Sequence, residues 1–313
     1  RDPSFSMELY EVGRRSRSDV AICYISDSVD QSVLNRMRKL IQSIDVDALT
    51  MNIESLAECM FTHKWINPFP KFKYSERPDT ATAAILDGNI VIMVDNSPAV
   101  MIIPASIFDI IEEADDFNFS PMIGSYLRIT RFFFSIVTWI LTPLWLLFVN
   151  NPDWVPEFMK FVLITDDITV PVLLQLLILE LAVDGLKLAA VNTPTMLSTP
   201  LSIVAGIVVG EYAVSSGWFN PEALLYMAVV TVGTYGQTNF EMGYAFKFLR
   251  VLTLILTQIF NLGGFIAGVV ISVLMIAFNR TITGKSYIYP LIPWDGKMLK
   301  RKVLRVRLPH SYK

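Results

Sequence analysis

The chain has 313 residues and a formal net charge of −3, and 53% of its residues are hydrophobic, which gives a mean hydropathy of +0.47. This hydropathy is too high for an ordinary soluble enzyme, so part of the chain is expected to lie in a membrane. The two cysteines, Cys23 and Cys59, are too few for a disulfide framework or a four-cysteine zinc site, and we expect buried, reduced thiols. Because the chain begins at Arg1 without a Met or a signal peptide, we expect it to start inside a longer protein.

The first 130 residues have the pattern of a soluble α/β domain. Residues 18–26 have the apolar run of a buried strand, and residues 29–44 repeat apolar side chains at the spacing of an amphipathic helix. Two further strands are predicted at 90–94 and 99–103, on either side of an Asp-Asn-Ser-Pro turn. These elements predict a small mixed sheet with helices packed against it.

This head shows no catalytic constellation. It has no P-loop, no dinucleotide-binding fingerprint and no zinc-ligand spacing, and its one histidine, His63, lacks a Cys or Ser partner set. We therefore expect no enzyme, no metal site and no cofactor. The arginines 14, 15 and 17 could bind an anion or anionic lipid, although salt-bridged surface is the more frequent role of such a cluster.

The second half of the chain is almost continuously apolar. Its first apolar run, Phe132–Val149, holds no charge and is about long enough as a helix to cross a hydrocarbon core. The strongly hydrophobic segments are 131–149, 200–217, 221–238 and 248–278, and 170–191 is an ambiguous fifth. The expected organisation is a cytosolic α/β domain (1–125), a polytopic α-helical membrane domain of four to five helices (126–280) and a basic cytosolic tail (281–313).

Charge asymmetry orients the expected membrane domain. Residues 280–313 carry nine basic side chains and one acidic side chain, which places the C-terminus in the cytoplasm by the positive-inside rule. Four crossings then return the tail to the side of the head. The last segment is longer than one span, and the Asn-Leu-Gly-Gly sequence at 261–264 predicts either a kink or the turn of a re-entrant hairpin.

The ambiguous segment carries three charged residues on one helical face. Glu180, Asp184 and Lys187 are spaced i, i+4, i+7. Ionisable groups within an apolar run usually face protein or water, so this face is a candidate pore or cavity lining. An interfacial helix that lies on the bilayer surface explains the pattern equally well.

Small and polar residues mark further candidate positions. The pairs Gly206/Gly210 and Gly264/Gly268 have the spacing of helix-packing glycines, and Glu211 beside the first pair is a pore-lining candidate. A polar helix end is formed by Thr234, Gln237 and Asn239. Its groups need other helices, water or passing ions as partners.

Several sequence blocks together resemble one known family, the A subunits of GerA-type spore germinant receptors. The blocks are GRRSRSDVAICYISDSVD (13–30), IDVDAL (44–49) and NPFPKFKYSERPDTATAAILDGNIVIMVDNSPAVMIIP (67–104). Within the family, residues 183–197, 232–250 and 285–299 resemble a branch that does not itself sense germinants. The resemblance covers essentially the whole chain.

This resemblance implies an integral protein of the spore inner membrane that takes part in germination. It implies a homo-oligomer, a ring of five, that releases monovalent cations from the spore core and amplifies the response of the germinant receptors. The expected partners are further copies of the chain, another membrane protein of the germination machinery and membrane lipid, with no nucleic acid. Five copies would turn one carboxylate per chain into an acidic ring.

Two other functions remain open at the level of sequence. The chain could be a non-conducting scaffold that clusters germination proteins through its head. It could also be a secondary transporter with broken helices, which Pro194, Pro200 and the 261–264 segment suggest, although no inverted repeat is visible.

Overall fold

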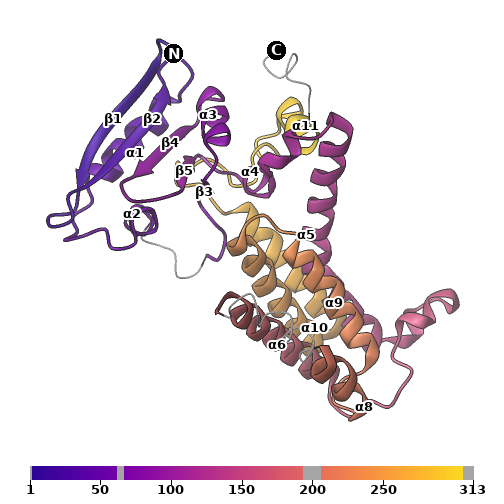
Figure 1. The fold of residues 1–313 in the computed structure, drawn as a ribbon. Helices are drawn as coiled ribbons and strands as arrows, with labels where there is room; N and C mark the ends of the chain where they lie inside the picture. The colour runs from indigo at the N-terminus through magenta and orange to yellow at the C-terminus, as the bar shows by residue number, and fades with distance from the viewer. Residues whose placement is uncertain (1, 62–66, 193–205, 306–313) are drawn as a thin grey trace. The chain divides into compact units, whose positions relative to one another are not determined.

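The computed structural model describes residues 2–61, 67–192 and 206–305, and it divides into two compact units (Figure 1). The α/β unit comprises Arg1–Ile129 together with Met275–Lys313, and the helical unit comprises Thr130–Leu274. The tail therefore belongs to the same unit as the head, whereas the sequence suggested a separate third part. His63, Pro194 and Pro200 lie outside the described residues.

A five-stranded sheet forms the centre of the α/β unit. Its spatial order is β1-β2-β4-β5-β3, and every neighbouring pair is antiparallel. The strands are β1 (Phe5–Val12), β2 (Ser18–Ile25), β3 (Lys73–Ser75), β4 (Ile90–Val94) and β5 (Val100–Ile103). The prediction of a mixed sheet is wrong, because no two neighbouring strands are parallel. After β2 the chain first forms β3 at the far edge of the sheet, and it then returns as β4, which lies antiparallel to β2.

Helices cover both faces of this sheet. The main core lies between one face and two helices, α1 (Gln31–Gln42) and α2 (Ile53–Met60). On the opposite face, α3 (Pro78–Leu86) packs against a small cluster that includes Cys23. Cys23 is buried and free as expected, whereas the free Cys59 is only half-buried.

The basic tail packs onto the head. Ile282 is buried within the main core, and the backbone carbonyl of Tyr287 accepts a hydrogen bond of 2.9 Å from the amide of Ile107. Lys285 pairs with Asp30 at 2.7 Å. The tail ends in a short helix, α11 (Gly296–Val303).

Further ionic contacts join the tail and the start of the long helix α5 (Pro121–Asn150) to acidic residues of the head. Lys302 pairs with Asp109 at 2.5 Å, on the short helix α4 (Ile107–Ile111). Arg128 of α5 is 2% exposed and pairs with Glu112 and with Asp116, which lies in the 3-10 helix η1 (Ala114–Phe117). Both ends of the chain segment that forms the helical unit therefore emerge from one folded body.

The helical unit is built from most of α5 and the elements that follow it. These are η2 (Pro152–Trp154), η3 (Glu157–Val162), α6 (Val172–Asn192), the π-helical η4 (Gly206–Tyr212), α8 (Ala213–Ser215), α9 (Pro221–Tyr235) and α10 (Phe240–Ala277). By length and composition, two of the described helices could cross a membrane, Pro121–Asn150 and Phe240–Ala277. The four to five spans expected from the sequence stay a prediction.

The last of these helices is a hairpin. Asn261 has φ of 51° and ψ of −128°, which no helix accommodates, and it separates an arm at 240–260 from an arm at 262–277. A Cβ on Gly264 would lie 1.7 Å from the carbonyl oxygen of Leu256, and a Cβ on Gly268 would lie 2.9 Å from the Cα of Thr253. In one straight helix residues 256 and 264 would be about 12 Å apart, so the second arm folds back on the first.

Side-chain contacts give the directions of the other helices. Gln175 and Asn220, at the starts of α6 and α9, exchange hydrogen bonds of 2.7 and 2.8 Å, and Lys187 near the end of α6 contacts Tyr235 at the end of α9. These two helices are therefore parallel. The first arm of α10 runs antiparallel to them.

The tip of the hairpin lies at the far end of α5. Asn151, immediately after α5, and Asn261 exchange side-chain hydrogen bonds of 2.6 and 2.9 Å. Near the middle of α5, Ser135 is hydrogen bonded to Gln237, which shortly precedes α10. The α5 helix and the first arm of α10 thus run in the same direction.

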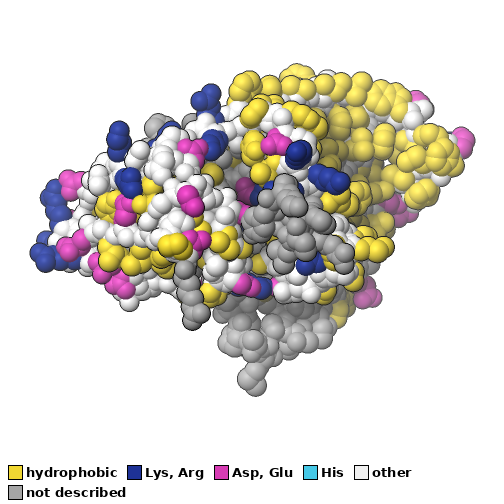
Figure 2. All heavy atoms as spheres, turned by 90° about the horizontal axis from the view of Figure 1, so that it is seen from above, with side chains coloured by type: hydrophobic (Ala, Val, Ile, Leu, Met, Phe, Trp, Pro, Cys, Tyr) yellow, Lys and Arg dark blue, Asp and Glu magenta, His cyan; other side chains and the backbone are white. Residues whose placement is uncertain are grey.

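Much of the surface of the helical unit is apolar. Figure 2 shows broad hydrophobic areas over this unit, whereas Lys, Arg, Asp and Glu side chains are frequent over the α/β unit. The exposed large side chains include Phe133, Ile136, Leu181, Val232, Ile259, Phe260, Ile266 and Val270. A surface of this kind is suited to lipid or to neighbouring helices.

Candidate functional site: a buried charge cluster in the helical unit

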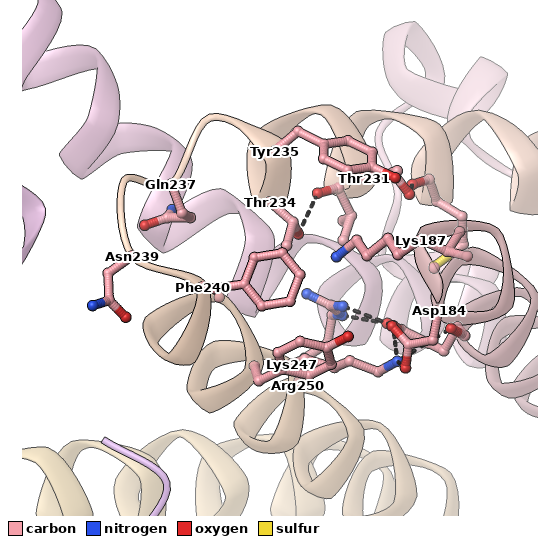
Figure 3. A pocket seen from close by; sticks show the side chains of 16 residues that line it. Asp184, Lys187, Thr231, Thr234, Tyr235, Gln237, Asn239, Phe240, Lys247 and Arg250 are labelled. Atoms are coloured by element: carbon pink, nitrogen blue, oxygen red, sulfur yellow. Dashed lines mark hydrogen bonds and ion pairs between the residues drawn. The ribbon is translucent and has the colours of Figure 1, made fainter. Parts of the chain in front are cut away.

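Five charged side chains meet between two apolar helices of the helical unit (Figure 3). The helix α6 supplies Glu180, Asp184 and Lys187, which share one face as the sequence spacing predicted. The first arm of α10 supplies Lys247 and Arg250, three residues apart and so also on one face. We refer to these five residues as the charge cluster.

The most buried pair of the cluster is Glu180 with Arg250. Their exposed fractions are 4% and 2%. The guanidinium donates from Nε to Glu180 Oε1 at 2.5 Å and from Nη2 to Oε2 at 2.9 Å, so the contact is bidentate. Its third nitrogen, Nη1, donates to the backbone carbonyl of Thr138 on α5. This pair consequently joins three helices.

Lys247 neutralises the second carboxylate. Its ammonium forms an ion pair with Asp184 and donates to the backbone carbonyl of Glu180 at 3.1 Å. It also lies 3.5 Å from Glu180 Oε2. Both acidic residues that were predicted to line a pore are therefore paired with basic residues of the same chain.

Lys187 is bound in a different way. Its side chain is directed among the rings of Tyr235, Phe240 and Tyr244, and Nζ lies 5.1, 5.9 and 5.5 Å from their centroids (Figure 3). The residue is 9% exposed. Within the described part of the chain, no carboxylate lies within 4 Å of its ammonium and no hydrogen-bond acceptor is in contact with it.

A cavity of about 110 Å³ adjoins the cluster. Its walls combine the charged residues, the three rings around Lys187 and the polar end of α9, where Thr231 and Thr234 face the cavity (Figure 3). Both threonine hydroxyls donate to carbonyls of their own helix, Thr231 to Met227 and Thr234 to Val230. The hydroxyl oxygens can still accept hydrogen bonds from the cavity, but their protons are already donated to these carbonyls.

The other polar residues near this helix end have structural partners. Gln237 is hydrogen bonded to Ser135 of α5, with Nε2 to Oγ at 3.0 Å. Asn239 caps the start of α10, since its Oδ1 accepts a bond of 2.9 Å from the amide of Met242. The polar helix end predicted from the sequence is thus bonded within the protein, Thr234 to its own helix, Gln237 to α5 and Asn239 to the start of α10.

Glu211 lies apart from the charge cluster. It is exposed on η4 and has no ion-pair partner within the described residues. Gly206 and Gly210 on the same segment have open space where a Cβ would project, whereas Gly264 and Gly268 form the close contact between the arms of α10. Helix packing at 206 and 210, like pore lining at Glu211, stays a prediction.

Sequence reasoning missed Lys247 and Arg250. Their signal was present, because a basic pair three residues apart interrupts the long apolar run of α10 just as the acidic pair interrupts α6. Reading the two interruptions together would have suggested a pairing. No group of three or more possible metal ligands occurs among the described residues, and the cluster has no nucleophile with a neighbouring base.

Comparison with known proteins agrees with the resemblance seen in the sequence. The model of the Bacillus/Clostridium GerA spore germination protein family matches residues 1–313. The stage V sporulation protein AF of Bacillus subtilis is 35% identical over 99% of this chain and 62% of its own length. The spore germination protein GerLA of Bacillus cereus is 27% identical over 98% of this chain and 62% of its own length.

One solved structure is also similar to part of the chain. It is the crystal structure of the N-terminal domain of the A subunit of the Bacillus megaterium spore germinant receptor GerK3, which is 31% identical. The match covers 32% of this chain and 78% of that domain, with a TM-score of 0.24.

The α/β unit and the apolar helical unit described above thus occur in a chain whose relatives are sporulation and germination proteins. The chain belongs to the GerA family of spore germination proteins. It spans about three fifths of the length of these two curated relatives, 62% in each case. The branch of the family that residues 183–197, 232–250 and 285–299 were predicted to resemble is that of stage V sporulation protein AF, and the 35% identity confirms this resemblance.

Proposed function

We propose that the chain is a subunit of an oligomeric cation channel in the spore inner membrane, which releases monovalent cations from the spore core during germination and amplifies the receptor response. In this proposal the helical unit crosses the bilayer with four to five of its helical segments. The α/β unit, with both termini of the chain, faces the cytosol. Family membership and the apolar surface of the helical unit support the proposal.

The observation that carries the proposal is the environment of Glu211. The residue lies in an apolar stretch at 206–215, and in the single chain it is exposed together with Ile207, Val208 and Tyr212. A lone carboxylate costs several kcal/mol in hydrocarbon, about 2.5 kcal/mol or more at the centre of a bilayer. The position therefore favours contact with water or with a further copy of the chain. A ring of copies would place one such carboxylate per chain around an axis.

The proposed partners follow from the same surface. The apolar side chains exposed on α5 and α10 need lipid or neighbouring helices. Five copies of the chain, together with another membrane protein of the germination machinery, would cover part of this area. The proposal gives the protein no enzymatic activity and no cofactor.

Conductance measurements on the full-length protein test this function. The protein, with its membrane partner, is placed in planar bilayers under a potassium gradient, and wild type is compared with Glu211→Gln. We expect discrete cation currents whose conductance or cation preference falls severalfold in the variant, because the acidic ring has lost its charge. Asp153→Asn, at an exposed carboxylate of η2 outside the long helices, is the matched control and should conduct as wild type.

A second function is favoured by one feature of the charge cluster. Glu180 and Asp184 are neutralised within the chain, so the cluster can serve as a structural joint in a protein that does not conduct. This chain would then be a scaffold that clusters germination proteins through its α/β unit. Silent bilayers with well-folded protein, and loss of germination only on substitution of surface residues of the α/β unit, would establish the scaffold and reject the channel.

A further inference from the structure

The charge cluster holds one more positive charge than negative charge. Two carboxylates, Glu180 and Asp184, face three cationic groups, and the two cations of α10 pair with them. Lys187 is the third cation, and among the described residues no carboxylate forms an ion pair with it. Residues 193–205, which lie outside the described part of the chain, contain no Asp or Glu and so offer no side-chain counter-charge.

The three aromatic rings do not remove this excess. A cation held against aromatic faces gains about 0.5–2 kcal/mol. Taking an ammonium out of water costs several kcal/mol even after the protein relaxes. More than nine tenths of Lys187 is buried, so the rings offset only part of the cost. An ammonium in this position is best satisfied by an anion that can also accept its hydrogen bonds.

The cavity next to Lys187 has room for such an anion. It lies against Lys187 between α6, α9 and α10, and its volume of about 110 Å³ exceeds the space that one water molecule occupies several times over. The walls next to the ammonium are the apolar faces of Tyr235, Phe240 and Tyr244. A charged end near Lys187 and a short apolar body against the rings would use both features.

We propose that this cavity is a binding site for a small monocarboxylate whose carboxylate oxygens accept hydrogen bonds from Lys187 Nζ. Binding brings the cluster to three positive and three negative charges. The site uses residues of one chain only, and it does not depend on whether the protein conducts cations. The contacts between α6, α9 and α10 around the cavity would be strengthened by occupancy.

Acetate is a suitable probe, because it has the required charge and is small enough for the cavity. The full-length protein in detergent micelles is titrated with sodium acetate, and sodium gluconate, whose anion is too large, keeps the ionic strength constant. We expect a saturable increase of several degrees in the unfolding temperature of the wild type. Equilibrium dialysis with radiolabelled acetate should give one site per chain.

Two lysine substitutions make the test specific. Lys187→Met should weaken acetate binding by at least roughly tenfold, because the charge-assisted hydrogen bonds are lost. Lys160→Met, at an exposed lysine of η3, should bind as wild type. The proposal is overturned if Lys187→Met binds acetate like the wild type. It is also overturned if dialysis of the wild type finds no saturable site, a result that does not depend on whether the variant folds.

Discussion

Glu8 of β1 joins the outer strand of the sheet to helix α1. Its carboxylate accepts hydrogen bonds from Tyr24 at 2.6 Å, from Tyr10 at 2.7 Å and from Arg38 Nε at 2.9 Å. The Arg38 guanidinium holds the pKa of Glu8 at about 2, well below its ordinary value of 4.5. The two tyrosine hydroxyls act in the same direction, and partial burial opposes them.

This low pKa makes the stability of the outer strands depend on pH. A carboxylate whose pKa is lower in the folded state stabilises that state above its unfolded pKa, and the contribution disappears as the pH falls from about 4.5 to about 2. We expect Glu8→Gln to lower the free energy of opening of β1 and β2 by about 2 kcal/mol at pH 7, with almost no effect near pH 2. Amide hydrogen exchange in the full chain measures both values. An equal difference at both pH values would contradict the assignment.

The bidentate pair in the helical unit gives a second prediction at this scale. Arg250→Met leaves a buried carboxylate with only Lys247 at 3.5 Å, so we expect it to destabilise the helical unit by about 3–5 kcal/mol. Replacing both members, Glu180→Met with Arg250→Met, removes the unpaired charge and should restore most of the loss. Unfolding in mixed micelles provides the comparison. A double variant as unstable as Arg250→Met alone would show that the pair has another role.

These residues also show where sequence reasoning stops at the residue scale. The spacing of Glu180, Asp184 and Lys187 on one helix correctly predicted a shared face, because helical periodicity is a local property. The partners of the two acids are more than 60 residues further along the chain, and only tertiary packing decides which cation each acid meets. The charge balance of the cluster therefore had to come from the structure.

At the level of elements, the α10 hairpin depends on closely packed backbones. Its turn places Asn261 at a positive φ, where asparagine is tolerated better than most side chains. Glycines 264 and 268 then allow the second arm to lie directly against the first. The tip is held by the paired amides of Asn151 and Asn261.

Adjacent glycines provide a matched test of this hairpin. A Cβ on Gly264 would overlap the backbone of the first arm, so we expect Gly264→Ala to destabilise the helical unit by about 3 kcal/mol or more. A Cβ on Gly263 meets nothing within 4 Å. Gly263→Ala should therefore be neutral or stabilise the arm by up to about 1 kcal/mol. Similar unfolding midpoints for the two variants would argue against the packed arms.

The sequence predicted some elements better than others for physical reasons. Four elements of the head, β2, α1, β4 and β5, were predicted within about two residues, because each has one apolar face or a continuous apolar run. The strand β1 was missed, since it is an edge strand whose apolar side chains Phe5, Met7 and Leu9 are exposed. The choice between a kink and a hairpin at 261–264 depended on one backbone conformation, which composition does not determine.

At the scale of the whole molecule, the α/β unit is discontinuous in sequence. Tail residues complete its core and pair with its acidic side chains, as Ile282 and Lys285 do. The sequence showed that the tail is basic, but it did not show that the tail packs onto the head. The acidic excess of the head, 19 acidic against 12 basic side chains in residues 1–130, was the available signal for an internal partner.

This arrangement predicts the sidedness of three exposed positions in a membrane. With Cys23 and Cys59 replaced by Ala, single cysteines are introduced as Asp27→Cys in the head, Lys297→Cys in the tail and Glu157→Cys after α5. The first two should react with a membrane-impermeant maleimide from the same side, because head and tail form one unit. Glu157→Cys should react from the opposite side, because α5 separates it from them. Labelling of all three from one side would exclude α5 as a membrane span.

The discontinuous α/β unit also has a consequence for biosynthesis. The ribosome completes β1 to β5 well before it makes Ile282, and the whole helical unit is synthesised in between. A nascent head therefore lacks part of its core, and its Asp30 lacks Lys285, until the last arm of α10 has emerged. Final closure of the head can occur only after the helical unit has been synthesised, so protease resistance of the head would report that translation has passed the helical unit and reached the tail.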